Sequence, residues 1–479
     1  MLTRIATLTA MILVAASASA QTVIPLKNAA PDGAGLGLLL TDGSVMYQGG
    51  GLADWYRLVP DTFGSYVNGS WVKAASLPAG YAPDAFSSAV MIDGRLVIAG
   101  GEYNNGNFVL TDECAVYDPK ADTWTRFAPP AGWGFIGDSP SAVLPDGKLL
   151  LGRKLDMRVA ALDPATLTWT ELGVAGKRDF NAEEGWTLLP NGTVLTYDVK
   201  TAPHSEIYDP TTAKWLNAGS TVANLKSPPS VGAIGYGHGL VYHPPGEVGP
   251  GILRPDGTVF ATGGTNKGGS FGHTAIYHPA ANGGLVGTWV AGPNFPNGID
   301  AGDNFAVLLP TGNVLVETNV GQLYEFDGAS LTAEPASAGG GSILMLPSGE
   351  AITGGNAVYR AAGPVNPAWA PVVTSAPAVV TRGTTYPVRG RQFNGLSQAA
   401  AFGDEYQAST NYPLVRLINT ASGHVVYART HDHSTMAVAT GAATVSTNFD
   451  VPAAAETGDS TLQVVANGIA SVPVALIIR

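Results

Sequence analysis

A short hairpin turn that follows an apolar run recurs seven times in this chain, and it limits the possible folds more than any other feature. The copies share a small polar residue followed by glycine, and their turn residues are Asp42, Asp93, Asp146, Asn191, Asp256, Thr311 and Ser348. Asp-Gly and Asn-Gly turns between apolar runs favour β-hairpins, because both central residues tolerate a positive φ. The copies recur about every fifty residues, which is typical of a repeat architecture built from small β-units.

Further strand signals follow each turn in a constant order. The next strand often ends in a glycine pair, as in LVIAGG. A third strand ends in an aromatic residue before Asp-Pro, as at Tyr117. Most units then end with a tryptophan, such as Trp124. The 61 glycines and 34 prolines favour short strands joined by turns over long helices. Four strands in this order resemble the kelch repeat, and seven copies between residues 30 and 373 predict a seven-bladed β-propeller, with the glycines and aromatics as packing residues.

The first twenty residues have the features of a secretory signal peptide. Arg4 supplies a positive charge, residues 10–16 form a short apolar core, and Ala18-Ser19-Ala20 resembles a cleavage site. No segment offers the roughly 18 consecutive apolar residues that a membrane-spanning helix needs. We therefore expect a secreted or periplasmic protein that begins at Gln21 and does not insert into a membrane.

The charge and cysteine content exclude other classes of function. The net charge is −12, so the chain lacks the basic surface that nucleic-acid binding requires. Cys114 is the single cysteine, which excludes an internal disulfide framework, and we expect it to be a small buried apolar residue. Phosphate-binding loops, dinucleotide fingerprints, nucleophile elbows and Cys-x-x-Cys pairs are absent from the sequence.

The repeat ends near residue 372. The sequence that follows contains alternating strand patterns without helical periodicity, such as TVSTNFDVP and STLQVVANG. This pattern predicts an antiparallel β-sandwich over residues 372–479, after a propeller over residues 21–371.

A signal peptide, seven kelch-like units and a C-terminal sandwich together resemble the galactose oxidase and glyoxal oxidase superfamily. In the C-terminal part the matching stretches are residues 413–434, 449–452 and 464–473. The resemblance covers nearly the whole chain after residue 20, and it implies that the sandwich is that family's early-set domain. The expected fold class is therefore all-β: a seven-bladed kelch-type β-propeller followed by an immunoglobulin-like (early-set) β-sandwich.

The copper site of that family is not recognisable in this sequence. Family oxidases bind copper with two tyrosines and two histidines, and they cross-link one tyrosine to a cysteine. Here Gly339 and Gly340 stand where the family has a Tyr-His pair, and Cys114 falls on an outer strand of its blade. The histidine of the sandwich loop has a match, His431 in RTHDHS. The ligands therefore do not support a copper-radical centre.

Carboxylates occupy the positions that face the propeller axis in that family. Asp138, Glu183 and Asp303 each lie eight residues before their turn residue, and Asp84 lies nine before its own. Crowded carboxylates raise one another's pKa unless a cation or hydrogen-bond donors lie among them. We expect an acidic axial mouth that binds a hard cation such as Ca²⁺, or the hydroxyls of a sugar. The alternative is that each acid accepts hydrogen bonds from a neighbouring blade or only contacts water.

His431 and His433 form the densest ionisable cluster together with Asp432. On an extended segment, residues two apart point the same way, and two such imidazoles suit Zn²⁺ or Cu²⁺ completed by carboxylates. The family resemblance implies that this loop reaches the axis and completes the acidic mouth. The alternatives are a general acid or base, or histidines hydrogen-bonded inside the domain interface.

Three functions stay open at this point. The first is an exported protein that binds a glycan or a cation at the acidic mouth, without copper-radical chemistry. The second is a metal-assisted hydrolase or lyase on polysaccharide that uses His431, His433 and the carboxylates. The third is a copper oxidase for alcohols or aldehydes with a divergent site, which requires Tyr236, Tyr242 or Tyr412 beside His431. The sequence identifies no catalytic residue, and a divalent cation is the cofactor type that the carboxylates favour.

Overall fold

The computed structural model describes residues 21–227, 234–235, 241–242, 246–265, 272–335 and 341–479, and the predicted signal peptide lies outside them. Within the described residues the chain forms β-strands and two short 3₁₀ helices, η1 (Ala281–Gly283) and η2 (Pro367–Trp369). The predicted all-β fold is confirmed. No helix of this part of the chain is long and apolar enough to cross a membrane.

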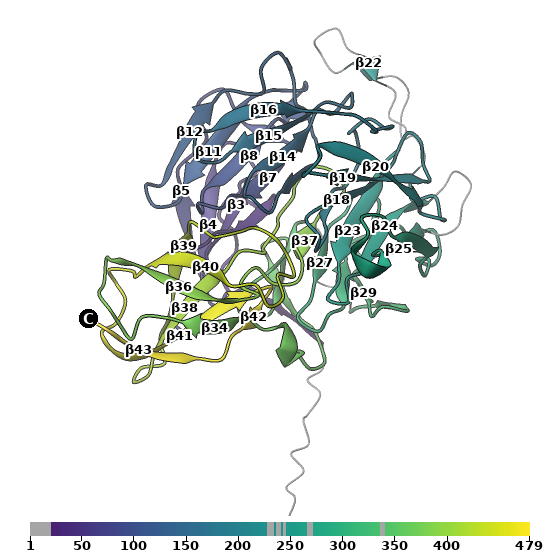
Figure 1. Cartoon of the computed structure of the whole chain (residues 1–479). Helices are drawn as coiled ribbons and strands as arrows, with labels where there is room; N and C mark the ends of the chain where they lie inside the picture. Colours follow the sequence, from purple (N-terminus) through teal and green to yellow (C-terminus); the bar gives the residue numbers. More distant parts are fainter. Residues whose placement is uncertain (1–20, 228–233, 236–240, 243–245, 266–271, 336–340) are drawn as a thin grey trace, which may run out of the picture.

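Seven antiparallel sheets follow one another along the chain (Figure 1). Six of them have four strands, and the sixth in chain order gains a fifth strand from the C-terminal part. The first four are β2 (Gly37–Leu39), β3 (Val45–Gln48), β4 (Trp55–Val59) and β5 (Ser70–Ala74); β7 (Ser87–Val90), β8 (Leu96–Ala99), β11 (Cys114–Asp118) and β12 (Thr123–Phe127); β13 (Ser141–Val143), β14 (Leu149–Gly152), β15 (Val159–Asp163) and β16 (Thr168–Leu172); and β17 (Thr187–Leu188), β18 (Val194–Tyr197), β19 (His204–Asp209) and β20 (Lys214–Ser220).

The last three sheets are β23 (Val248–Leu253), β24 (Val259–Thr265), β25 (Gly272–His278) and β26 (Thr288–Ala291); β27 (Ala306–Leu308), β28 (Val314–Val316), β29 (Tyr324–Phe326) and β30 (Leu331–Ala333); and β31 (Ile343–Met345), β32 (Ala351–Thr353) and β33 (Ala357–Arg360) with β1 (Thr22–Pro25). Short additional pairings involve β6 (Pro83–Asp84), β9 (Tyr103–Asn104) and β10 (Asn107–Phe108), and β21 (Ile234–Gly235) with β22 (Val241–Tyr242).

The seven sheets are the blades of a propeller. The innermost strand of each blade begins it, and contacts between these strands run from β7 through β13, β17, β23, β27 and β31 to β2. The first strand of the chain, β1, pairs antiparallel with β33 and so supplies the outer strand of the last blade. The last blade is therefore built from strands of both ends of the repeat region, which ties the start of the ring to its end.

The glycines and tryptophans of the repeat pack neighbouring blades together, as expected. The indole of Trp124 donates to the carbonyl of Ala75 at 3.1 Å, which joins the second blade to the first. A Cβ at Gly100 would lie 2.3 Å from the carbonyl oxygen of Gly137, and its φ of 80° also favours glycine. Cys114 is buried on β11, in agreement with its predicted packing role.

The C-terminal part forms a curled sheet with its own apolar core, seen in yellow and light green against one side of the propeller in Figure 1. Its strands are β34 (Val372–Ser375), β35 (Val379–Val380), β36 (Thr385–Arg391), β38 (Leu414–Asn419), β39 (Val425–His431), β40 (Val445–Asp450), β41 (Gly458–Ala466), β42 (Ile469–Ala470) and β43 (Val474–Ile478). The predicted propeller-plus-sandwich architecture is confirmed, whereas the boundary at residues 371/372 stays a prediction.

One segment of the C-terminal part enters the centre of the propeller, and we call residues 398–412 the axial finger. Its strand β37 (Ala400–Ala401) pairs with the innermost strand β27 of the sixth blade. The finger also accepts a hydrogen bond from Leu188 of the fourth blade through Gln398, and Tyr406 N donates to the carbonyl of Phe86 beside the second blade. Contacts with blades on different sides of the ring place the finger on the axis.

Candidate functional site

A fully buried lysine lies among carboxylates at the end of the axis where the innermost strands begin. Lys154 follows β14, and its Nζ forms ion pairs with Asp138 and, at 2.8 Å, with Glu183. Lys154 is 0 % exposed, Asp138 4 % and Glu183 7 %. Lys154 donates a hydrogen bond to Asp138, and its ion pair with Glu183 joins the third blade to the fourth.

The axial finger adds two carboxylates to the same place. The backbone N–H of Glu183 donates to Asp404 Oδ2 at 3.2 Å, and oxygens of Asp138, Glu183 and Asp404 lie within 4.8 Å of one another. A second group with the same spacing contains Asp303, Asp404 and Glu405. Asp404 therefore links an inner half around Lys154 to an outer half around Asp303. We call these five acids with Lys154 the axial cluster.

Burial and mutual repulsion control protonation in the inner half. Loss of hydration raises the pKa of Asp138 and of Glu183 well above the ordinary range, and Lys154 opposes this without cancelling it. Burial acts to lower the pKa of Lys154, but the surrounding carboxylates, Asp138 first, outweigh it and leave the pKa raised. The ammonium group of Lys154 is therefore the resident charge that the inner carboxylates require.

The acids of the outer half have no ion-pair partner within the described parts of the chain. Burial, followed by repulsion from Asp404, raises the pKa of both Glu405 and the neighbouring Glu247. Asp303 is exposed, and loss of hydration, followed by repulsion from Glu247 and Asp404, raises the pKa of its carboxyl. Among the described residues, no lysine or arginine forms an ion pair with any of these four acids.

Two of these carboxylates sit on strained backbone. Glu183 has a φ of 59° and Asp303 a φ of 54°, both in the left-handed region that costs a non-glycine residue about 1–2 kcal/mol. Both lie eight residues before their turn residue, and so does Ala85, with a φ of 48°. Because Ala85 shares this conformation, the positive φ is a feature of the segment that precedes the innermost strand in these blades, and in two of them it carries a carboxylate.

The structure brings together three of the four predicted carboxylates. Asp138 and Glu183 meet at Lys154, and Asp303 meets the finger. Asp84 instead accepts a hydrogen bond from Tyr406 and is in neither group of converging oxygens. The prediction that these acids bind a ligand is not tested by the geometry and stays a prediction.

The histidine loop does not lie where the family resemblance placed it. Thr430 N donates to Thr41 O, His433 N to Ile92 O, and Met436 N to Pro145 O. These acceptors adjoin the hairpin turns of the first three blades, at the opposite end of the innermost strands from the carboxylates. The expectation that this loop completes the acidic mouth is corrected: the finger residues Asp404 and Glu405 do so.

His431 and His433 each have their own partners. His431 pairs with Asp432 at 2.7 Å and with Asp450 at 3.2 Å. His433 is 4 % exposed, its Nδ1 lies 2.8 Å from the hydroxyl of Thr447, and burial lowers its pKa to about 3. Neither histidine is in a group of converging ligand atoms within the described part of the chain, and their metal binding stays an untested prediction.

Of the three tyrosines that a divergent copper site requires, Tyr412 is the one whose side chain falls within the described residues. Tyr412 is buried in the finger and donates its hydroxyl to the carbonyl of Leu39. Tyr236, Gly339 and Gly340 lie outside the described residues, and Tyr242 is described only as part of β22.

Sequence reasoning missed Lys154, Asp404 and Glu405. Lys154 lies after the second strand of its blade, and no residue pattern of the repeat marks that position as facing the propeller axis. Asp404 and Glu405 form a Gly-Asp-Glu sequence, and two adjacent acids in an otherwise apolar stretch, AAAFGDEYQ, are the signal that could have identified them.

Comparison with known proteins supports the fold. No protein-family model and no curated protein matches the sequence. Among solved structures, a fungal alcohol oxidase of the AA5 family, in complex with copper, matches with a TM-score of 0.52 and 13% identity, over 96% of this chain and 99% of that chain. The extracellular domain of a putative one-component system from B. thetaiotaomicron matches with a TM-score of 0.47 and 11% identity, over 97% of this chain and 58% of that chain. The chain is therefore similar in fold to this fungal alcohol oxidase.

Proposed function

We propose that this is an exported binding protein that holds a divalent cation in the outer half of the axial cluster and, through it, the hydroxyl groups of a carbohydrate. The observation that carries the proposal is the convergence of Asp303, Asp404 and Glu405 oxygens within 4.8 Å of one another, with Asp303 exposed. Oxygens at this spacing match the coordination of hard cations, which accept additional oxygen ligands from hydroxyls.

The charge of the cluster supports a cation over a neutral ligand alone. Lys154 offsets part of the charge of the inner acids, whereas Glu247, Asp303, Asp404 and Glu405 lack an ion-pair partner within the described residues. Burial, followed by repulsion from neighbouring acids, raises the pKa of Glu247, Asp303 and Glu405. A divalent cation relieves this repulsion most directly.

An unsatisfied acceptor in the inner half also supports a ligand. Asp138 Oδ1 is buried and has no hydrogen-bond partner, although Asp138 Oδ2 is bonded to Lys154. Buried carboxylate oxygens are normally hydrogen-bonded, so a group without a partner favours a donor supplied by water or by a sugar hydroxyl.

A second candidate function is acid–base catalysis on a carbohydrate. Burial raises the pKa of Asp138 and of Glu183, and a raised carboxyl pKa is the property required of a general acid. Release of shortened products from a bound glycan would favour this candidate over binding alone.

Calorimetry tests the proposal directly. The protein from Gln21 onward, dialysed against EGTA, is titrated with Ca²⁺, and glycan-array binding is then measured with and without Ca²⁺. We expect Ca²⁺ binding, Ca²⁺-dependent glycan binding, and an affinity for Ca²⁺ weakened about tenfold or more in Asp303→Asn and Glu405→Gln. Asp146→Asn, on an exposed hairpin turn, is the matched control. Unchanged Ca²⁺ affinity in both axial variants would overturn the proposal.

Export and the domain boundary are part of the same proposal. Cleavage after Ala20 is tested by N-terminal sequencing of the protein from the medium or periplasm, with Gln21 expected as the first residue. Limited proteolysis near residue 372 tests the predicted boundary between propeller and sandwich.

A further inference from the structure

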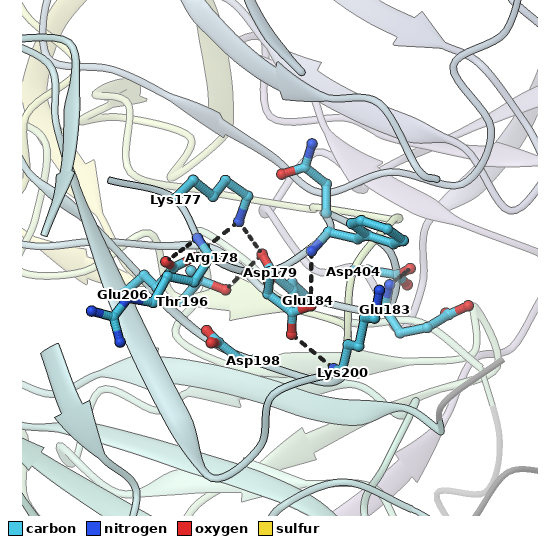
Figure 2. A network of polar contacts seen from close by, with 12 residues as sticks. Lys177, Arg178, Asp179, Glu183, Glu184, Thr196, Asp198, Lys200, Glu206 and Asp404 are labelled. Carbon is cyan, nitrogen blue, oxygen red and sulfur yellow. Dashed lines mark hydrogen bonds and ion pairs between the residues drawn. The ribbon is translucent and has the colours of Figure 1, made fainter. Parts of the chain in front are cut away.

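A second network of buried charges lies in the fourth blade, next to the axial cluster (Figure 2). Lys177 Nζ forms ion pairs with Glu184 Oε2 at 3.0 Å and Glu206 Oε2 at 3.3 Å, and it lies 4.2 Å from the ring centre of Trp215. The side chains of all three charged residues are 0 % exposed. We call these residues, with Asp179, Asp198 and His204, the Lys177 network.

The network contains more negative than positive charge. Its four carboxylates belong to Asp179, Glu184, Asp198 and Glu206, and its basic groups are Lys177 and the His204 ring that bonds Asp198. Burial raises the pKa of Glu184 and of Asp198, and Lys177 only partly opposes this at Glu184. Uncompensated charge in a dry interior is costly, so these groups require a further positive partner or a proton.

Two buried oxygens of the network have no partner. Glu184 Oε2 accepts from Lys177 and Thr196, and Asp198 Oδ2 accepts from Thr201 and His204. The other oxygen of each group, Glu184 Oε1 and Asp198 Oδ1, is buried and has no hydrogen-bond partner among the residues that the structure describes. Glu184 is 0 % and Asp198 2 % exposed. Buried carboxylate oxygens are normally hydrogen-bonded, so these two unpartnered oxygens indicate a missing partner, whatever the number of acids nearby.

Asp179 completes the group. Its carboxylate accepts from the backbone N–H groups of Lys200 at 2.7 Å and Thr201 at 3.0 Å, which fixes its position. One oxygen each of Asp179, Glu184 and Asp198 lies within 4.8 Å of the others. Figure 2 shows these side chains gathered beside Lys177 and Glu206.

We infer that Asp179, Glu184 and Asp198 form a buried divalent-cation site of the calcium type, distinct from the axial cluster. Asp179 accepts backbone N–H groups at both oxygens, at Oδ1 from Phe180, whereas Glu184 and Asp198 each keep one buried oxygen without a partner among the described residues. Three carboxylates with oxygens at this spacing match the hard oxygen ligands that Ca²⁺ prefers. The cation joins the loop at residues 177–184 to the β18–β19 hairpin, which carries Asp198.

The site positions an axial residue. Glu184 belongs to the Lys177 network, while its neighbour Glu183 points to Lys154 and has a strained φ of 59°. A cation held by Glu184 fixes the backbone on one side of this strained residue. Glu184 therefore acts as a positioning residue for the axial cluster, and the cation contributes to folding stability because the unfolded chain cannot bind it equally well.

The test measures calcium content and thermal unfolding of the full chain from Gln21 onward. After dialysis into Ca²⁺ buffer and removal of excess ion, mass spectrometry determines Ca²⁺ per chain for the wild type, Glu184→Gln, Asp198→Asn and Asp303→Asn. We expect both network variants to lose one equivalent that Asp303→Asn retains. Excess EGTA should lower the Tm of the wild type and of Asp303→Asn, and should leave the Tm of Glu184→Gln unchanged.

Glu171→Gln is the matched control, because Glu171 is an exposed partner of Arg158 in the preceding blade. It should retain the wild-type calcium content and the EGTA effect. If Glu184→Gln does not fold, Asp198→Asn still tests the site. The inference is overturned if the wild type holds no Ca²⁺, or if Asp303→Asn retains none of the Ca²⁺ that the wild type holds. Loss of calcium only in Asp303→Asn would refute this site and leave the axial proposal standing; loss only in the network variants would do the reverse.

Discussion

The substitution Lys154→Met removes the positive charge from the inner half of the axial cluster and keeps a similar apolar stem. The ammonium group bonds Asp138 and, at 2.8 Å, Glu183, whose side chains are 6 % and 8 % exposed. Removal of one partner from a buried ion pair typically destabilises a protein by about 3–5 kcal/mol, because an uncompensated charge stays behind.

The cost of protonating a carboxyl gives a second, independent value for the loss in free energy of unfolding. Without Lys154, a buried carboxyl is expected to take up a proton, and forcing a carboxyl of ordinary pKa near 4.3 to be neutral at pH 7 costs about 4 kcal/mol, against about 1 kcal/mol at pH 5. A carboxyl whose pKa is raised by folding binds more protons in the folded state, so stability falls as the pH rises from the unfolded towards the folded pKa. The variant should therefore be far less stable than the wild type at pH 7 and closer to it at pH 5.

Urea unfolding followed by circular dichroism at pH 5 and pH 7 measures this difference. Lys148→Met is the control, because Lys148 forms an exposed pair with Asp146 and its loss should change the free energy of unfolding by at most about 1 kcal/mol. Equal effects of Lys154→Met and Lys148→Met at pH 7, or a larger deficit of Lys154→Met at pH 5 than at pH 7, would refute the reasoning.

Three further predictions follow from individual contacts. Tyr406→Phe removes the hydroxyl that bonds Asp84 and accepts from a backbone N–H, so we expect a loss of about 1–3 kcal/mol in chemical unfolding, and no loss would contradict the contact. Gly100→Ala places a methyl group against the carbonyl of Gly137 at a φ of 80°, so the Tm should fall, with an unchanged Tm as the contrary result. The ring signals of His433 should not shift between pH 5 and 8 in NMR spectra, since burial lowers its pKa to about 3; the folded state therefore loses stability as the pH falls below the unfolded pKa near 6.5, and titration near that value would contradict its burial.

The blades could be predicted because their signals are local. Each hairpin turn and the strands beside it lie within a few residues of one another, so Asp93 or Asn191 identifies its blade without knowledge of the rest of the chain. The offset of eight residues also located Asp138, Glu183 and Asp303 on one end of the axis, where oxygens of Asp303 and Glu183 each converge with Asp404.

The positions of the remaining site residues depend on contacts between segments that lie far apart in the sequence. Asp404 meets Glu183 only because the axial finger leaves the sandwich and pairs through β37 with β27, and no local pattern encodes that path. His431 was misplaced for the converse reason: a short motif matched the family, but β39 holds it beside the hairpin turns. Lys154 balances charges that come from other blades, so its role appears only once the blades are assembled.

A crystal structure of the protein soaked in Ca²⁺, or in Mn²⁺ for its anomalous signal, tests the central claim most directly. The account predicts a cation bound by Asp303, Asp404 and Glu405, with Lys154 still paired to Asp138 and Glu183. Well-ordered water alone among these three carboxylates at millimolar cation, or a finger that leaves Asp404 away from Glu183, would contradict it.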